Sequence, residues 1–210
     1  MSTILAVCTG NICRSPMAAG FLRAGLAERG ASGVGVASCG VVGWEGAPAV
    51  PEAIEAMVEK GIDISGHTAR RFGPGLARDA DLILAMAAEH RAAVVAAAPE
   101  CAARTFTLKE LAHLIGRLPL GAIDREAGAE SRPALLAAAA DDLRGSGSVQ
   151  PSRDEDVADP LGLGVEAFRA TAWEIEGRCR EVLDAAFGPQ AQAGAEASGS
   201  EITRLKGGAG

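Results

Sequence analysis

Tyrosine is absent from this chain of 210 residues, and aromatic residues of every kind make up only 3% of it. A hydrophobic core must therefore be built mainly from aliphatic side chains and alanine, which the hydrophobic content of 48% allows. The missing tyrosine also excludes control of this protein through phosphorylation of its own tyrosine side chains.

Positive charge is scarce as well. The 20 Lys and Arg residues are outnumbered by 27 Asp and Glu residues, which gives a formal net charge of −7. A nucleic-acid-binding domain usually carries a basic surface, so we expect no nucleic-acid partner. No apolar run is long enough to span a bilayer, and "MSTILAVC" lacks the basic start and the length of a signal peptide. We therefore expect a cytoplasmic monomer with no membrane partner.

Cysteine is sparse and odd in number. The sequence has Cys8, Cys13, Cys39, Cys101 and Cys179, and an odd count argues against a disulfide framework. No pair has the spacing of a structural zinc site, and only three histidines are present, so we expect no metal. The three downstream cysteines are expected to be small buried hydrophobic residues.

What the chain does contain is an alternation of strand-like and helix-like segments. Expected strands lie at 3–7, 34–38, 81–86 and 105–108, and expected helices at 16–30, 51–60, 88–98, 109–118 and 165–187. This alternation predicts an α/β fold with a parallel sheet. The apolar residues of the helices are assigned to the core, and they include Val58 and Trp173.

Two stretches have a different composition. Residues from about 120 to 155 are rich in polar residues, Gly and Pro, and are expected to form a long loop with one helical piece at "ALLAAAADDLR". From Gly188 onward the composition is that of a flexible tail. We therefore expect one domain over residues 1–187 and a tail over 188–210.

The segment "VCTGNICRSPMA", residues 7–18, joins the first expected strand to the first expected helix. Gly10 and Asn11 readily take positive φ, so the loop can curl and turn backbone amides inward next to a helix N-terminus. Such a nest binds an oxyanion, and Arg14 adds a planar fork suited to phosphate. Cys8 in this positive field is expected to have a pKa below the usual value of about 8.5. The alternative is a buried cysteine in an ordinary turn, with Arg14 on the surface.

With these residues, the segment resembles the phosphate loop of the bacterial low-molecular-weight protein tyrosine phosphatases. The resemblance implies a flavodoxin-like three-layer α/β/α fold with a four-stranded parallel sheet and a phosphate loop after the first strand. It implies that Cys8 attacks phosphorus to form a phosphocysteine, that Asn11 holds the loop curled, and that Ser15 hydrogen-bonds the Cys8 sulfur. It also implies phosphate binding by the loop residues Thr9, Gly10, Asn11, Ile12, Cys13 and Arg14.

The same family keeps a general acid in an Asp-Pro pair before its last helix, and "DEDVADPLGLG" supplies Asp159 and Pro160 there. Asp159 is implied to protonate the leaving oxygen and then to activate the water that hydrolyses the phosphoenzyme. The neighbouring Asp154 and Asp156 are expected to belong to a solvated acidic loop.

Two further stretches, "VASCGVVGW" and "DISGHTARRF", resemble the family's second strand and a later loop. By this resemblance Ser38 supports the phosphate loop from behind, His67 contacts the loop asparagine, and Trp44 lines the substrate site. Leu161 forms the opposite wall, where the family usually has an aromatic residue. Since a leucine offers no ring–ring contact, strict specificity for phosphotyrosine is less secure than phosphatase chemistry.

Cys13 lies five residues after the expected nucleophile. In the family a cysteine at this place can form a disulfide with the nucleophile. We therefore predict reversible oxidative inactivation, in which Cys13 resolves a sulfenic acid on Cys8.

The sequence thus predicts a hydrolase for phosphomonoesters, most simply phosphotyrosine in proteins, that uses no cofactor. One alternative is an arsenate reductase on the same fold, which would need further cysteines close enough to relay a disulfide. Cys101 and Cys179 are isolated in the sequence, which argues against that relay. The other alternative is a non-catalytic phosphoprotein-binding module, which would need neither a reactive thiol nor an acid.

Overall fold

The computed structural model describes residues 2–119, 121–124, 126–150 and 154–190. Its centre is a four-stranded sheet in which every neighbouring pair of strands is parallel, in the order β2–β1–β3–β4. The strands are β1 (Ser2–Cys8), β2 (Val34–Gly40), β3 (Leu82–Ala85) and β4 (Thr105–Thr107). The four expected strands are all present, with ends that differ by one or two residues.

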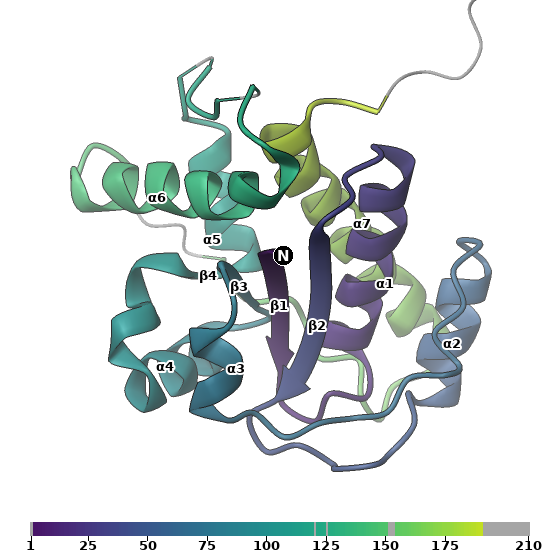
Figure 1. Ribbon diagram of the computed structural model, residues 1–210. Coiled ribbons are helices and arrows are strands. Elements are labelled where there is room, and N and C mark those ends of the chain that lie inside the picture. Colours follow the sequence, from purple (N-terminus) through teal and green to yellow (C-terminus); the bar gives the residue numbers. More distant parts are fainter. Residues whose placement is uncertain (1, 120, 125, 151–153, 191–210) are drawn as a thin grey trace, which may run out of the picture.

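Helices cover both faces of this sheet (Figure 1). One face carries α1 (Arg14–Glu28), α5 (Leu108–Ile115) and α7 (Val165–Phe187), and α2 (Pro51–Val58) packs on α7. The other face carries α3 (Pro74–Arg78), α4 (Ala88–Ala97) and the 3₁₀ turn Pro99–Arg104. This three-layer arrangement and strand order confirm the predicted flavodoxin-like fold.

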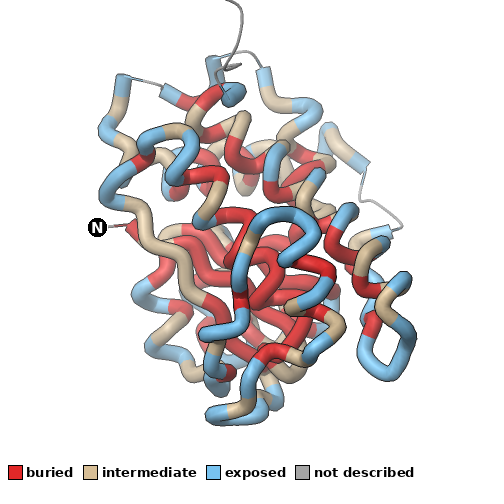
Figure 2. The backbone as a smooth tube through the Cα atoms, turned by 90° about the vertical axis from the view of Figure 1, so that its right-hand side faces the viewer, coloured by how far each residue is buried: buried red, intermediate tan, exposed pale blue. Residues whose placement is uncertain are grey.

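The central strand β1 is buried on both sides. Ile4 and Ala6 pack against the helices of one face, whereas Leu5 and Val7 pack against those of the other. A strand covered on both faces reads as a continuous apolar run, which is why "TILAV" was recognisable as a strand. Figure 2 shows the buried residues gathered at the centre of the molecule, with exposed residues around them.

The core assignments held for the three downstream cysteines, which are buried free thiols. They were wrong for two apolar helix residues. Trp173 on α7 is 72% exposed, and Val58 at the end of α2 is 57% exposed. Both side chains lie on helix faces turned away from the core, and an apolar residue on the surface is common enough that composition cannot identify it.

The helical piece expected at "ALLAAAADDLR" within the long loop is confirmed as α6 (Arg132–Gly145), which follows a 3₁₀ turn at Ala129–Ser131. Leu136, Ala137 and Ala140 of α6 are buried in the main core. Figure 1 shows α6 at the end of the sheet where β1 begins, far from the end where β1 leads into α1. The predicted tail falls outside the described residues, apart from 188–190.

The carboxyl ends of β1 and β2 meet at the opposite end of the sheet, where ligands bind in open parallel sheets. Here β1 leads into a curled segment, residues 8–14, which we call the phosphate loop. Gly40 at the end of β2 lies directly against it. A Cβ atom at Gly40 would be 2.6 Å from the carbonyl oxygen of Thr9 and 2.8 Å from the backbone nitrogen of Asn11. Only glycine therefore allows β2 and the loop to approach this closely.

Candidate active site

Cys8 lies at the bottom of the phosphate loop and is fully buried. Its sulfur is 3.3 Å from the backbone nitrogen of Asn11, which donates to it, and 3.0 Å from the hydroxyl oxygen of Ser15. The Ser15 hydroxyl also lies 3.3 Å from the carbonyl oxygen of Cys39. Both the Asn11 amide and the Ser15 hydroxyl can therefore donate a hydrogen bond to a sulfur anion.

Asn11 holds the loop in its curled shape. Its φ is 59°, and no other non-glycine residue in the described ranges has a positive φ. Its side-chain nitrogen donates to the hydroxyls of Ser15 and Ser38, each at 2.9 Å. Its side-chain oxygen accepts from the backbone nitrogen of Arg70 at 2.8 Å, and its backbone carbonyl accepts from Nε2 of His67 at 2.7 Å. These four bonds offset the strain of the left-handed backbone, which costs on the order of 1 kcal/mol.

Removal of the Asn11 side chain should loosen the loop. We expect Asn11→Ala to lower kcat/KM for p-nitrophenyl phosphate by roughly 10- to 100-fold. The substitution leaves the backbone N–H of Arg70 and the two serine hydroxyls without their partner, and each buried polar group that loses its hydrogen bond costs about 1–3 kcal/mol. Asn11→Gly loses the same bonds but accepts positive φ without strain, so it should unfold at a higher temperature than Asn11→Ala. Thermal unfolding and steady-state kinetics of both variants provide the test. Wild-type kcat/KM in Asn11→Gly would show that these bonds do not position the loop.

Arg14 begins α1, and its side chain is only 4% exposed. Its Nη1 donates to the carbonyl oxygen of Val157 at 3.0 Å. Its Nη2 donates to the hydroxyl of Thr9 at 3.3 Å and to the carboxylate of Asp159 at 2.6 Å. The buried Nε of Arg14 has no partner among the described residues, so this N–H is a donor that an oxyanion beside the loop can use.

The segment between α6 and α7 brings the expected acid to this loop. Val157 donates its backbone N–H to the carbonyl of Met86 at 2.8 Å, and the carboxylate of Asp156 accepts from the backbone N–H of Ala88 at 2.7 Å. These contacts fix the segment to the end of β3 and the start of α4. Asp154 pairs with Lys109 at 2.7 Å. Asp154 and Asp156 are thus engaged with groups other than Cys8.

Asp159 is the acid that reaches the loop. Besides its ion pair with Arg14, its carboxylate accepts from the backbone N–H of Leu161 at 3.1 Å and lies 4.0 Å from the sulfur of Cys13. Its side chain is 45% exposed, so it sits where the loop opens to solvent. The structure therefore brings together Cys8, Arg14 and Asp159, which the sequence supplied from opposite ends of the domain.

Burial, and next the charge of Cys8, raises the pKa of the Cys13 thiol to about 12. Cys13 is consequently protonated at neutral pH, and a protonated thiol is a weak nucleophile. Cys8 and Cys13 are both free thiols here. A disulfide between them therefore stays a prediction, and its formation should be slow.

This prediction can be tested by peroxide treatment of the wild type and of Cys13→Ser, followed by dithiothreitol. We expect the wild type to recover most of its activity and Cys13→Ser to recover less, because a disulfide protects Cys8 from irreversible oxidation. Equal recovery of the two proteins would contradict a resolving role for Cys13.

His90 is a residue of the site that the sequence analysis missed. It is fully buried on α4, and its Nε2 lies 2.8 Å from the hydroxyl of Thr9, the same hydroxyl that accepts from Arg14. Burial, and next the charge of Arg14, lowers the pKa of His90, which keeps the imidazole neutral. The histidine was visible in the sequence after the third strand, but only the packing of α4 shows that it faces the loop.

Apolar side chains are exposed on both segments that flank the loop. Trp44 donates its backbone N–H to the carbonyl of Gly10 at 3.2 Å, and its side chain is 52% exposed. On the other segment, Leu161 and Leu163 are 45% and 58% exposed. Such side chains can contact the group that carries a phosphate, and the leucines do so without an aromatic ring.

The described residues contain no group of three or more His, Cys, Asp or Glu arranged to hold a metal ion. Within the same ranges, no helix combines the length and the apolar character needed to cross a membrane.

A family model described as low molecular weight phosphotyrosine protein phosphatase matches residues 3–118, more than half of the chain and the whole phosphate loop. The chain belongs to this family. The phosphatase is 43% identical over 111 residues to the probable low molecular weight protein-tyrosine-phosphatase EpsP of Ralstonia solanacearum, which covers 53% of this chain and 73% of that relative. It is 32% identical over 173 residues to a protein-arginine-phosphatase of Geobacillus stearothermophilus, which covers 82% of this chain and 88% of that relative.

A solved structure of the same family has a similar fold. The low molecular weight protein tyrosine phosphatase from T. tengcongensis superimposes with a TM-score of 0.65 at 31% identity, over 88% of this chain and 99% of that one. The protein is therefore a cysteine-dependent phosphatase that acts on phosphoproteins. Arsenate reduction is not favoured, because Cys101 and Cys179 lie in the two cores on opposite faces of the sheet and so do not form the downstream pair that a disulfide relay would need.

Proposed function

We propose that this phosphatase hydrolyses phosphotyrosine in proteins and that Cys8, Arg14 and Asp159 carry out the reaction. The observation that supports this most directly is the Arg14 side chain, which contacts the hydroxyl of Thr9 in the loop and the carboxylate of Asp159 at once. These contacts support the proposal, because they join the residue proposed to clamp phosphate both to the loop that holds Cys8 and to the proposed acid. A binding module would require neither the nucleophile nor the acid.

In the first step, the thiolate of Cys8 attacks phosphorus, and the bond between phosphorus and the phenolic oxygen breaks. Arg14 and the backbone amides of the loop hold the three non-bridging oxygens, which carry the charge of the transition state. A phosphoryl group that engages Arg14 displaces the Asp159 carboxyl toward the leaving oxygen. Asp159 in its protonated form donates its proton there, so tyrosine leaves as a neutral phenol.

In the second step, water attacks the phosphorus of the phosphocysteine. The Asp159 carboxylate accepts a proton from that water, the bond between phosphorus and sulfur breaks, and inorganic phosphate leaves. The sulfur departs as a thiolate, to which Ser15 at 3.0 Å and the Asn11 amide at 3.3 Å can both donate. Ser38 and His67 act through Asn11 and are positioning residues.

Phosphoarginine is the second candidate substrate, because the relative from Geobacillus stearothermophilus that matches 82% of this chain is a protein-arginine-phosphatase. Phosphotyrosine is favoured by the exposed indole of Trp44 beside Gly10, against which a phenol ring can stack. Leu161 lacks the ring that would complete a sandwich.

Peptides of one sequence that carry phosphotyrosine, phosphoarginine or phosphoserine would decide between the substrates. We expect the highest kcat/KM for phosphotyrosine. Leu161→Phe should raise it by roughly 2- to 10-fold, the worth of an aromatic pair of about 0.5–1.5 kcal/mol, and should leave phosphoserine unchanged. A higher kcat/KM for phosphoarginine than for phosphotyrosine would reverse the assignment.

We also propose the cytoplasm as the site of action. All five cysteines are free thiols, a state that a reducing compartment maintains.

A further inference from the structure

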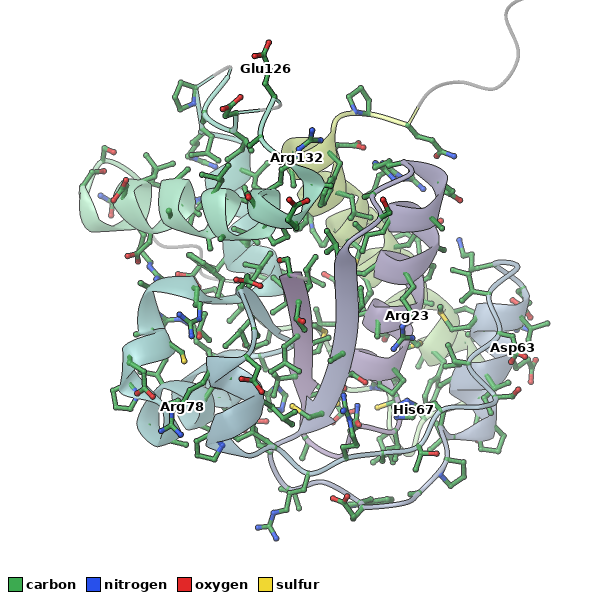
Figure 3. All side chains as sticks on the ribbon, in the orientation of Figure 1. Arg23, Asp63, His67, Arg78, Glu126 and Arg132 are labelled. Carbon is green, nitrogen blue, oxygen red and sulfur yellow. The ribbon has the colours of Figure 1, made fainter. Side chains whose placement is uncertain are left out.

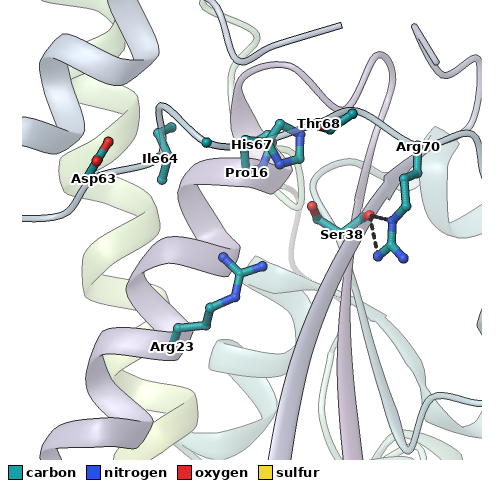
Figure 4. A pocket seen from close by; sticks show the side chains of 9 residues that line it. Pro16, Arg23, Ser38, Asp63, Ile64, His67, Thr68 and Arg70 are labelled. Atoms are coloured by element: carbon teal, nitrogen blue, oxygen red, sulfur yellow. Dashed lines mark hydrogen bonds between the residues drawn. The ribbon is translucent and has the colours of Figure 1, made fainter. Parts of the chain in front are cut away.

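A pocket of about 430 Å³ lies beside Asn11 of the phosphate loop, since Ser38, His67 and Arg70 of its wall hydrogen-bond that residue (Figure 4). Arg23 comes from α1, Ser38 from β2, and His67 and Arg70 from the segment that follows α2. Cys8, Arg14 and Asp159 are not among the residues that line it. We call this cavity the rear pocket.

The rear pocket is rich in unpaired positive charge. Arg23 donates through Nη2 to the carbonyl of Val36 at 3.4 Å, and Arg70 donates through Nε and Nη2 to the carbonyl of Ser38 at 3.4 and 3.2 Å. Neither guanidinium forms an ion pair with a carboxylate in the described part of the chain. Several of their N–H groups therefore have no hydrogen-bond partner among the described residues, in a protein whose net charge is −7.

The other groups of the pocket leave this charge in place. His67 uses Nε2 for the carbonyl of Asn11, and Figure 3 shows it near Arg23 on the same side of the molecule. One carboxylate, Asp63, also lines the pocket, but it accepts from the backbone N–H of Ser65 at 2.7 Å. In Figure 4 Asp63 lies at the end opposite to Arg70.

The positive groups act on one another. The pKa of Arg23 is lowered by burial and by the charge of Arg70. The pKa of His67 is lowered by burial, with contributions from Arg23 and Arg70. A bound anion would relieve this repulsion, and two guanidinium forks with a hydroxyl between them match a tetrahedral oxyanion.

We propose that the rear pocket, formed around Arg23, Ser38 and Arg70, is a second binding site for a phosphate-class oxyanion. The volume exceeds that of a free phosphate ion, so it also accommodates the group that carries a phosphate. Two sources share this chemistry: inorganic phosphate, which the reaction releases, and a second phosphoryl group of a phosphoprotein substrate.

The rear pocket is connected to the phosphate loop through Asn11. Ser38, His67 and the backbone of Arg70 all hydrogen-bond Asn11, each from the pocket wall. An anion that hydrogen-bonds Arg70 and Ser38 therefore changes the contacts that hold the phosphate loop curled. Binding of this anion should lower kcat. The expected decrease in kcat rests on the proposed function, whereas anion binding in the rear pocket does not.

Binding is tested by titration of the protein with inorganic phosphate, followed through the NMR signals of the arginine Nε–H groups and the His67 ring. We expect two saturable events in the wild type. Arg23→Gln should weaken the event at Arg70 and His67 by at least about fivefold, the loss of one charge-assisted hydrogen bond. Arg117→Gln is the matched control, because Arg117 is exposed, carries the same charge, and in the described part of the chain its side chain hydrogen-bonds only His113. Equal midpoints in Arg23→Gln and the wild type would overturn the proposal.

The coupling is tested by phosphate inhibition of p-nitrophenyl phosphate hydrolysis. We expect mixed inhibition in the wild type and in Arg117→Gln, and purely competitive inhibition in Arg23→Gln. The same mixed pattern in all three proteins would overturn the coupling. If no protein hydrolyses the substrate, the proposed function has failed, and the NMR titration still decides the anion site.

A doubly phosphorylated peptide distinguishes the two sources. If the second phosphoryl group occupies the rear pocket, this peptide should bind Cys8→Ser at least about fivefold more tightly than its singly phosphorylated form, and addition of Arg23→Gln should remove the difference. If inorganic phosphate is the occupant, the two peptides should bind alike while the phosphate titration still shows two events. Either result supports the rear pocket as an anion site. If the two peptides bind alike and the phosphate titration shows only one event, the proposal is overturned.

Discussion

Replacement of Cys8 with serine is expected to lower kcat for p-nitrophenyl phosphate by at least about 10³-fold, as the loss of a catalytic nucleophile does in other enzymes. The reason lies in what surrounds the sulfur. Its hydrogen-bond partners in the described residues are the Asn11 amide and the Ser15 hydroxyl, and neither is a base that could deprotonate a serine. A thiol loses its proton far more readily than a hydroxyl does.

The fold should survive this change, because serine is nearly the same size and can hydrogen-bond Ser15. Circular dichroism and the affinity for inorganic phosphate should therefore match the wild type. Cys101→Ala is a suitable control, since Cys101 is a buried thiol in the core on the other face of the sheet. Retention of a tenth or more of the activity in Cys8→Ser would contradict the assignment of the nucleophile.

Asp159→Asn is expected to lower kcat/KM for a phosphotyrosine peptide by roughly 10²–10³-fold, the usual contribution of a general acid. The amide can still accept a hydrogen bond from Arg14, so the loop contacts remain, but it cannot supply a proton. The loss should be smaller for p-nitrophenyl phosphate, because nitrophenolate is a more stable anion than the phenolate of tyrosine and needs protonation less.

This dependence on the leaving group separates acid catalysis from a role in binding. Measurement of kcat/KM for both substrates in the wild type, Asp159→Asn and Asp154→Asn provides the comparison, because kcat/KM reports on formation of the phosphocysteine and not on its hydrolysis. Asp154 lies on the same segment but pairs with Lys109, so its variant should behave like the wild type. An equal loss for both substrates in Asp159→Asn would show that Asp159 acts on binding rather than on the leaving group.

The fold and the centre of the site could be predicted from local sequence. A strand buried on both faces reads as an unbroken apolar run, and this placed β1 and β3. The phosphate loop is local too, since Cys8, Asn11 and Arg14 lie within seven consecutive residues. Asp159 is far away in sequence, and it was found only because an Asp-Pro pair before the last helix matches a known family.

Other parts depend on packing that no local pattern records. His90 and Arg70 reach the loop because of how α4 and the segment after α2 lie against it, and each is separated from Cys8 by more than sixty residues. Trp173 shows the opposite problem, because an apolar side chain on α7 faces solvent. The start of α6 was expected two residues too late, because its alanines and charged residues lack a strong apolar stripe, although four of its residues are buried.

The position of Asp159 in the sequence also affects when the active site can form during synthesis and folding. Cys8 is made before Asp159 and α7, and α7, which packs against α1, is made after all four strands. A nascent chain that ends before Asp159 holds a thiol and an arginine but no acid, and its α1 lacks the cover of α7. In the proposed mechanism, catalysis therefore begins only after the segment with Asp159 has folded back onto the phosphate loop and α7 has packed on α1.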